Sequence, residues 1–256
     1  MIESIDLNSD LGEGYGPWRM GDDAAMLALV TSANVACGGH ASDPETMFET
    51  LTAARAHGVV VGAHPGYPDR EGFGRRQVPY SAAECERFVA AQIGALRGVA
   101  ALAGTKVAYV KAHGALANLA CGEREIAAAI ARASAAVDRT MPILAISGTV
   151  LEDVARSMGL EVYSEVFADR GYQPDGRLVP RKHPEALLHD ESAVTNRMIA
   201  FLRSGLMPTV GAAPISLQAH SICVHGDSPG AVALARSLRD GLTKEGITIQ
   251  PFLRQP

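Results

Sequence analysis

The amino-acid sequence predicts an α/β fold, a distorted (β/α) barrel with about seven parallel strands. Short apolar runs alternate with helical patterns, which is typical of parallel βαβ units. Polar side chains and glycines follow nearly every apolar run. A barrel brings the carboxyl ends of all its strands around one mouth, whereas an open sheet serves its ligand mainly from one or two loops. The distribution of polar residues therefore favours the barrel.

The expected strands are apolar runs that are short and bounded by Gly, Pro or polar residues. Such runs are typical of parallel strands that are covered on both faces. They lie at residues 4–8, 33–37, 59–63, 107–111, 143–147, 161–168 and 221–224.

The expected helices lie between these runs, at residues 43–57, 81–103, 123–137, 150–158, 184–203 and 229–245. Asp43 is the expected N-cap of the first, with Pro44 at the first helical position. Ser81 and Glu84 have the spacing of a capping box at the start of the second. The irregular segment at residues 169–183 is expected to be a loop at the active site.

Composition limits the class of protein. The 256 residues are 47% hydrophobic and 20% charged, without a linker-like segment, so we expect a single domain over residues 1–256. A formal net charge of -5 argues against a nucleic-acid partner. No signal peptide or membrane helix is recognisable, and we expect a cytoplasmic protein. The four cysteines lack metal-site spacing and are expected to be reduced, with Cys223 a small buried core residue.

Histidines end four of the apolar runs, in NVACGGHA, VVVGAHPG, VAYVKAHGA and ICVHGDSPG. Because the carboxyl ends of barrel strands meet at one mouth, we expect these side chains to share a pocket. The residues concerned are His40, His64, His113 and His225.

Charged residues accompany the histidines. Asp10 and Glu13 follow the first strand and are suited to binding a metal, orienting a water or acting as a general base. A turn-forming Asp and a helix-capping Glu are the structural alternative. Lys111 and His113 are two residues apart, so a strand would point both into the barrel. There Lys111 must meet a carboxylate of the protein or an anion of the substrate.

Other polar residues at the strand ends are candidates for binding substrate or nucleotide. The candidates are Asn8, Asn34, Arg75, Asp169, Arg170 and Arg181, while Asp227 joins the catalytic candidates. Guanidinium groups bind phosphate or carboxylate, although solvated surface arginines are equally common. No Walker loop, HExxH, GxSxG or strand-following GxGxxG motif is present, so a bound nucleotide would be held without a P-loop.

Six segments, in their order and spacing, resemble the LamB/YcsF family over residues 3–254: DLNSDLGEG, NVACGGHASDP, GAHPGYPDREGFGRR, VKAHGALAN, EVFADRGYQPDGRLVPR and VHGDSPGAV. The resemblance implies a seven-stranded barrel like those of glycoside hydrolases and polysaccharide deacetylases. It also implies ATP-dependent hydrolysis of 5-oxo-L-proline (pyroglutamate) to L-glutamate, with ADP and phosphate. In this family the chain would act as the A subunit of a three-component 5-oxoprolinase, with subunits B and C as partners.

The resemblance also suggests roles for the candidates. Three cations would neutralise phosphoryl or carboxylate charge: Lys111, Arg75 and Arg170. Three carboxylates would coordinate Mg-ATP or activate water: Asp10, Glu13 and Asp227. The four histidines would carry protons or donate to a developing oxyanion. ATP, with Mg²⁺, is the expected co-substrate, no residue is assigned as a ligand of a tightly bound metal, and direct metal binding by the protein stays open.

Two other functions stay open at this point. Carboxylates and histidines at a barrel mouth also hold zinc or manganese, so a metal-dependent amidase or deacetylase is one alternative. The other is a non-catalytic subunit that binds a lactam or a sugar. The sequence also leaves the oligomeric state open, with a homo-oligomer as one option.

Overall fold

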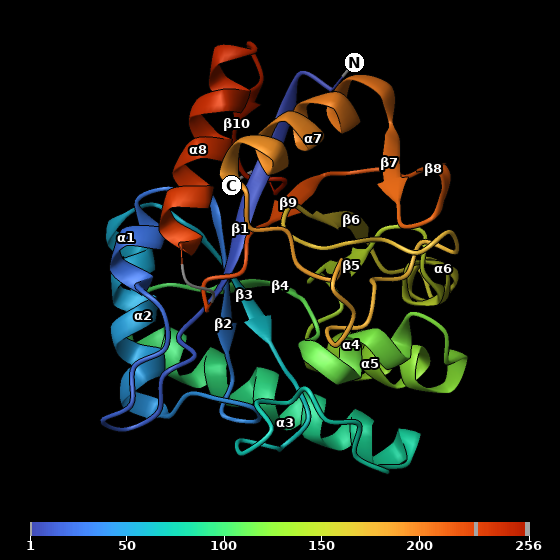
Figure 1. The fold of residues 1–256 in the computed structure, drawn as a ribbon. Coiled ribbons are helices and arrows are strands. Elements are labelled where there is room, and N and C mark those ends of the chain that lie inside the picture. Colours follow the sequence, from blue (N-terminus) through green and yellow to red (C-terminus); the bar gives the residue numbers. More distant parts are fainter. Residues whose placement is uncertain (1, 228–229, 254–256) are drawn as a thin grey trace.

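A closed barrel of seven parallel strands forms the centre of the molecule, in a computed structural model that describes residues 2–227 and 230–253 (Figure 1). The strands follow one another around the barrel in chain order, and the last pairs with the first. They are β1 (Ser4–Leu11), β2 (Ser32–Ala36), β3 (Val60–His64), β4 (Val107–Val110), β5 (Ile143–Ile146), β6 (Val162–Phe167) and β9 (Ser221–Cys223). The predicted fold class is confirmed.

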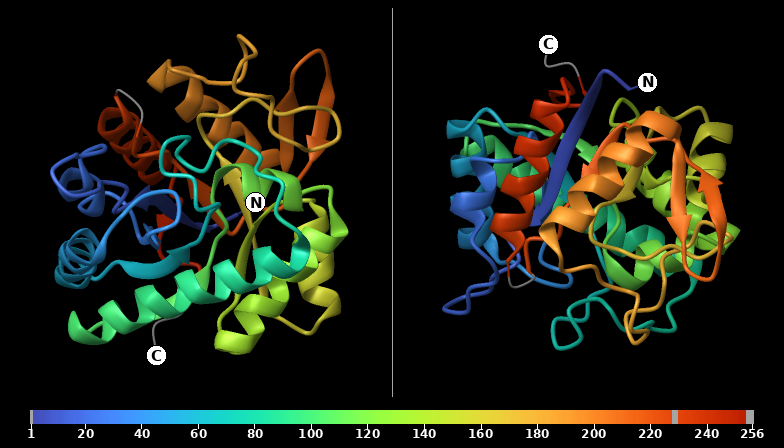
Figure 2. Two further views of the ribbon diagram at one scale, coloured as in Figure 1. Left: turned by 90° about the horizontal axis from the view of Figure 1, so that it is seen from below. Right: turned by 45° about the horizontal axis from the view of Figure 1, so that its top comes forward.

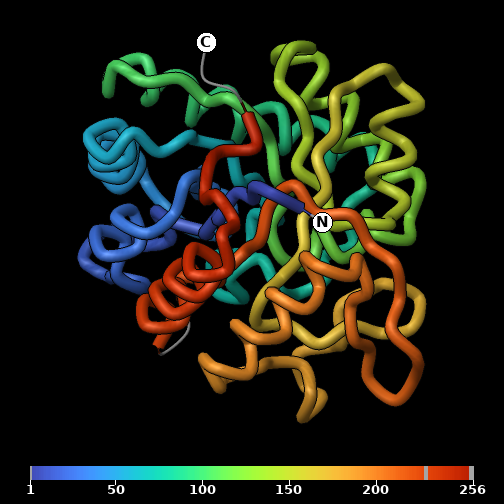
Figure 3. Tube along the Cα trace, turned by 90° about the horizontal axis from the view of Figure 1, so that it is seen from above, coloured from blue at the N-terminus to red at the C-terminus, as the bar shows by residue number. Residues whose placement is uncertain are grey.

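Helices surround the barrel, as the views along and across it show (Figures 2 and 3). They are α1 (Asp23–Leu27), α2 (Pro44–Ala56), α3 (Ala82–Leu102), α4 (Gly114–Ala120), α5 (Arg124–Val137), α6 (Val150–Ser157), α7 (Glu191–Ser204) and α8 (Ala231–Lys244). Each longer helix buries apolar side chains against the strands or a neighbouring helix. None of the helices in the described ranges combines the length and hydropathy needed to span a bilayer.

The predicted helix starts are confirmed where a capping signal is present. The Asp43 carboxylate accepts hydrogen bonds from the backbone N–H groups of Glu45 and Thr46. Ser81 and Glu84 form the capping box expected at the start of α3. Each cap satisfies backbone donors that the first helical turn leaves without a partner.

Two helix starts differ from the expectation. The helix expected from residue 184 begins at Glu191, because Asp190 caps it by accepting a hydrogen bond from the Ala193 N–H. The preceding residues belong instead to the long loop after β6. Pro229, the expected start of the last helix, lies outside the described residues, and α8 begins after Gly230, whose φ is 82°.

The described part of the chain holds five elements that the sequence did not predict. The short helices α1 and α4 follow β1 and β4, and a hairpin of β7 (Leu206–Thr209) and β8 (Ala212–Ser216) follows α7 (Figure 2). The two-residue strand β10 (Thr248–Ile249) pairs with the first residues of β1.

The amino end of the barrel is filled by aromatic side chains. The Tyr109 ring lies over Gly62, where an added Cβ would be only 2.2 Å from it. Tyr109 also makes an edge-to-face contact with Phe252, at 5.0 Å between ring centroids. This packing closes one end of the barrel and leaves the carboxyl ends of the strands to form a cavity.

Candidate active site at the carboxyl end of the barrel

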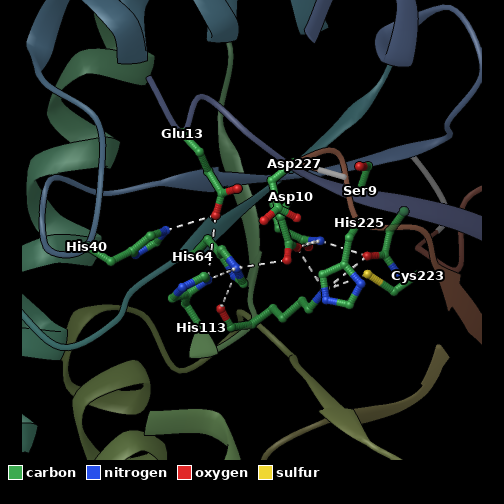
Figure 4. Close-up of polar contacts among 12 residues, drawn as sticks. Ser9, Asp10, Glu13, His40, His64, His113, Cys223, His225 and Asp227 are labelled. Carbon is green, nitrogen blue, oxygen red and sulfur yellow. Dashed lines mark hydrogen bonds and ion pairs between the residues drawn. The ribbon is translucent and has the colours of Figure 1, made fainter. Parts of the chain in front are cut away.

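A cavity of about 330 Å³ opens at the carboxyl ends of the strands. Eight of the predicted site residues line it: Asp10, His64, Arg75, Lys111, His113, Arg170, Arg181 and His225. The remaining six contact members of this set, so the structure brings all the predicted residues into one region. Figure 4 labels seven of them: Asp10, Glu13, His40, His64, His113, His225 and Asp227. Their contacts with one another distinguish cavity groups from supporting groups.

Lys111 lies at the floor of the cavity, surrounded by groups of the protein. Its Nζ is 2.9 Å from both Asp10 Oδ1 and Glu165 Oε1, 3.3 Å from Asn8 Oδ1 and 3.2 Å from Cys223 Sγ. Burial alone would lower the pKa of Lys111, but these neighbours, Asp10 foremost, hold it well above its usual value. The sequence left two possible partners for Lys111, a carboxylate of the protein or an anion of the substrate. The structure shows two carboxylates of the protein, Asp10 and Glu165.

Asp10 has partners on both carboxylate oxygens. Oδ1 accepts hydrogen bonds from Lys111 and from Asn34 Nδ2, the latter at 2.9 Å, and Oδ2 lies 3.3 Å from His64 Nε2. Burial opposes ionisation, yet the charges of His64 and Lys111 hold the pKa of Asp10 well below its usual value. Asp10 is therefore an ionised, fixed carboxylate in the cavity wall.

Asn8 and Asn34 lie beneath the cavity and do not line it. Asn34 Nδ2 donates to Asn8 Oδ1 at 2.7 Å as well as to Asp10, and Tyr109 donates its hydroxyl to Asn34 Oδ1 at 2.6 Å. Asn8 Nδ2 donates to Glu165 Oε1 at 2.9 Å. Both amides thus hold the charged floor groups in place by hydrogen bonds within the protein.

Three histidines and Glu13 meet at one side of the cavity. His64 Nδ1 donates to the Lys111 carbonyl at 2.8 Å, and His113 Nε2 donates to the Phe73 carbonyl at 2.8 Å. The other two ring nitrogens, His64 Nε2 and His113 Nδ1, are 3.0 Å apart. His40 stacks on His113 at 3.6 Å between ring centroids, and its Nε2 is 3.0 Å from Glu13 Oε1.

Arg170 is a cation in the wall of the cavity. Arg170 is buried, and its Nε and Nη2 donate to the carbonyls of Ala186 and Val179 at 3.0 and 2.8 Å. Burial, followed by repulsion from Arg181, lowers the pKa of Arg170 to about 10. Within residues 2–227 and 230–253, no carboxylate lies within 4.0 Å of its guanidinium nitrogens. Arg170 is thus a buried cation available to an anion.

Two further acidic candidates are each paired with one partner. Arg75 Nη2 donates to Asp227 Oδ2 at 2.7 Å. His225 Nδ1 is 2.9 Å from Asp169 Oδ2. Burial alone would raise the pKa of Asp169, but the charge and hydrogen bond of His225 hold it below its usual value. This hydrogen bond orients the His225 ring through Nδ1, so Asp169 does not occupy the other ring nitrogen, Nε2.

Glu165 lines the cavity, and the sequence predicted no role for it. Its Oε1 contacts Lys111, whereas its buried Oε2 has no hydrogen-bond partner among the described residues. Burial raises the pKa of Glu165 despite the attraction of Lys111. The signal was one acidic residue inside the apolar run VYSEVF. Cys223, expected in the core, is buried as predicted but also touches the Lys111 ammonium group.

Comparisons with known proteins agree over the whole chain. The A subunit of 5-oxoprolinase from Rhodopseudomonas palustris (strain BisB5) is 51% identical over 98% of this chain and 99% of that protein. The protein of the same name from Chloroflexus aggregans (strain MD-66 / DSM 9485) is 49% identical, over 96% and 98%. The crystal structure of the lactam utilization protein from Thermus thermophilus matches with a TM-score of 0.91 at 39% identity, over 96% and 99%. The model of the LamB/YcsF family matches residues 5–255, and the chain belongs to this family.

Proposed function

We propose that this chain is the A subunit of a 5-oxoprolinase and takes part in the ATP-dependent hydrolysis of 5-oxo-L-proline to L-glutamate, ADP and phosphate. Subunits B and C are the proposed partners. The observation that carries the proposal is the cavity of about 330 Å³, with ionised Asp10 in its wall beside Arg170, a cation that has no carboxylate partner among the described residues. The name shared by the relatives supports a role in a 5-oxoprolinase. The ATP-dependent reaction and the partner subunits are what the resemblance to the family implies.

The chemistry requires both an anion site and a proton acceptor. A five-membered lactam is a poor electrophile, and transfer of the γ-phosphoryl group of ATP to its oxygen turns that oxygen into a leaving group. Water then adds at the same carbon and the ring C–N bond breaks, which leaves an acyl phosphate and the free amine. A second water displaces phosphate from the acyl phosphate, so that one lactam, one ATP and two waters give glutamate, ADP and phosphate. Cations must hold the substrate carboxylate and the phosphoryl oxygens while this charge moves.

The geometry divides these roles among the residues. Arg170, Arg181 and Arg75 are the proposed anion-binding groups, since they stand at the cavity wall. Lys111 is committed to Asp10 and Glu165, so we assign it to positioning the Asp10 carboxylate.

Proton transfers fall to two fixed groups. Asp10 is ionised at the cavity wall and is the proposed acceptor of a proton from the attacking water. His225, oriented by Asp169, is the proposed donor to the ring nitrogen as it leaves. The Mg²⁺ that accompanies ATP fits Asp227 better than Asp10, because both oxygens of Asp10 already have partners in the protein.

The test is reconstitution with purified partners. Glutamate and phosphate release are measured for this chain alone and for all three subunits together, with and without ATP. We expect glutamate only when ATP and all three subunits are present, with one phosphate released per glutamate. Glutamate formation by the metal-loaded chain without ATP would support a metal-dependent amidase instead. Full turnover with Asp10→Asn would support a non-catalytic binding role.

A further inference from the structure

We propose that Glu13, His40, His64 and His113 bind one divalent transition-metal ion of the zinc class. Each residue offers one ligand atom, and the four atoms lie within 4.8 Å of one another (Figure 4). All four residues are buried. They come from three strand ends and the turn after β1, so the closed barrel itself assembles the set.

The outer nitrogens of two rings are already fixed by the backbone. His64 Nδ1 donates to the Lys111 carbonyl, and His113 Nε2 donates to the Phe73 carbonyl, each at 2.8 Å. A carbonyl accepts and never donates, so both outer nitrogens carry the proton. Metal-binding histidines are usually held in this way, with the second N–H on a carbonyl or carboxylate.

When both rings are neutral, the inner nitrogens face each other without a proton. In the neutral rings, His64 Nε2 and His113 Nδ1 each present a lone pair across 3.0 Å, which is a repulsive arrangement. A cation between them removes the conflict. A proton on His64 Nε2 would serve His113 Nδ1 and Asp10 Oδ2, the latter 3.3 Å away, whereas a metal ion would also serve His40 Nε2 and Glu13 Oε1, which lie 3.0 Å apart beside them. We therefore infer a metal ion rather than a shared proton.

The spacing and the donor types agree with this ion. Ligand atoms around tetrahedral zinc lie about 3.3 Å apart, given metal–ligand distances of about 2.0 Å. Here neighbouring ligand atoms are 3.0, 3.0 and 3.6 Å apart. Three imidazoles and one carboxylate suit Zn²⁺, Co²⁺ or Mn²⁺, whereas Mg²⁺ and Ca²⁺ prefer oxygen ligands.

The packing around the rings keeps them in place. A Cβ added at Gly74, whose φ is 60°, would lie 2.7 Å from the His40 Cβ and 2.9 Å from the His113 Cδ2. A Cβ added at Gly66 would lie 2.9 Å from His40 Nδ1. The stacked rings of His40 and His113 therefore pack closely against the backbone of Gly66 and Gly74. Such rigidity is expected of a site that holds its ligands before the ion arrives.

The ion would also lie next to the reaction cavity. His64 and His113 line that cavity, and Asp10 Oδ2 is 3.3 Å from His64 Nε2. A metal ion there would supply Lewis acidity toward an oxygen atom of a substrate or a water. The binding claim does not depend on which reaction the chain performs.

The experiment measures metal binding directly. The wild-type chain is purified, its metal content is measured by mass spectrometry, and it is stripped with a chelator and titrated with Zn²⁺, Mn²⁺ and Co²⁺, the last followed by visible absorption. We expect one equivalent bound and a higher melting temperature after Zn²⁺ is added. His40→Gln and Glu13→Gln should weaken Co²⁺ binding by at least about tenfold.

The matched control is His225→Gln, which changes another histidine of the same mouth and should keep the metal. Circular dichroism identifies variants that fail to fold. If a variant fails to fold, its metal binding is not interpreted and the titration of the wild type tests the proposal. The proposal is overturned if the stripped wild type binds none of the three ions, or if folded His40→Gln and Glu13→Gln bind as tightly as His225→Gln. A chain that binds metal but supports no glutamate formation would contradict the proposed function and leave this inference standing.

Discussion

At the scale of single residues, two buried cations in the same cavity have different surroundings. Lys111 is within 2.9 Å of two carboxylates, so its charge is already compensated inside the protein. Within the described ranges, the guanidinium group of Arg170 donates to backbone carbonyls and keeps an uncompensated charge at the cavity wall. A bound anion gains most from the cation that lacks a partner. The two residues therefore call for different experiments.

Arg170→Met should lower kcat/KM of the assembled enzyme by at least about tenfold, chiefly by raising KM, because a charge-assisted contact to the anionic substrate is lost. Met keeps much of the aliphatic volume, so the fold should persist. Steady-state kinetics of the three-subunit complex measure the change. The control is Arg177→Met, an exposed arginine of the same loop that pairs with Asp175. Equal kcat/KM values for both variants would contradict the role of Arg170.

Lys111→Met should destabilise the protein as well as stop turnover. The change leaves Asp10 and Glu165 buried beside each other without their common cation, and breaking a buried ion pair costs about 3–5 kcal/mol. Denaturant unfolding at pH 7.5 measures this loss. The double variant Lys111→Met/Glu165→Gln removes one of the orphaned charges and should recover part of the stability. No recovery would show that the carboxylates do not depend on Lys111.

At the scale of elements, Asp190 determines where α7 begins. Its carboxylate accepts a hydrogen bond from the Ala193 N–H at 2.7 Å. Asp190→Ala should therefore reduce the free energy of unfolding by about 1 kcal/mol, the usual cost of losing an N-cap. Urea unfolding provides the measurement, with exposed Glu185→Ala in the preceding loop as control. If the two variants are equally stable, the cap contributes nothing and the start of α7 has another cause.

The elements that the sequence predicted are those with local signals. The barrel strands are short apolar runs. Asp43 and the Ser81 capping box each begin a helix through hydrogen bonds to residues no more than three positions away in the chain. The start of α7 also has a local signal, the Asp190 cap, although the sequence predicted a helix that begins at residue 184. The hairpin β7–β8 has weaker local signals. The partnership of Lys111 with Glu165 joins two distant strands, so no spacing rule could identify it.

At the scale of the whole molecule, the barrel interior carries charge at both ends. The carboxyl end holds the cavity with its ion pairs and histidines. Toward the amino end, Asp6 is buried and accepts hydrogen bonds from the hydroxyl groups of Thr31, Ser32 and Ser221. Neutral donors solvate this carboxylate without supplying a countercharge. Its effect therefore falls on stability, away from the reaction site.

Asp6 should make the protein less stable as the pH rises toward neutrality. Burial raises its pKa from 3.8 to about 6, against the hydrogen bonds of the three hydroxyl groups. The folded state thus keeps a proton that the unfolded state has already released, and the resulting stability is present below about pH 4 and lost as the pH passes 6. Each pH unit in this window costs about 1.4 kcal/mol.

Asp6→Asn removes this titration while keeping the size of the side chain. Relative to wild type, the variant should therefore become more stable by about 1–2 kcal/mol, as a larger free energy of unfolding, between pH 5 and pH 7.5. Denaturant unfolding of both proteins at the two pH values measures the difference, with exposed Asp240→Asn on α8 as the matched control. Only the change with pH tests the prediction, because the amide also replaces one hydrogen-bond acceptor with a donor and so shifts the stability at both pH values. A difference that stays constant between the two pH values would mean that Asp6 is ionised in the folded state at pH 5 as fully as at pH 7.5.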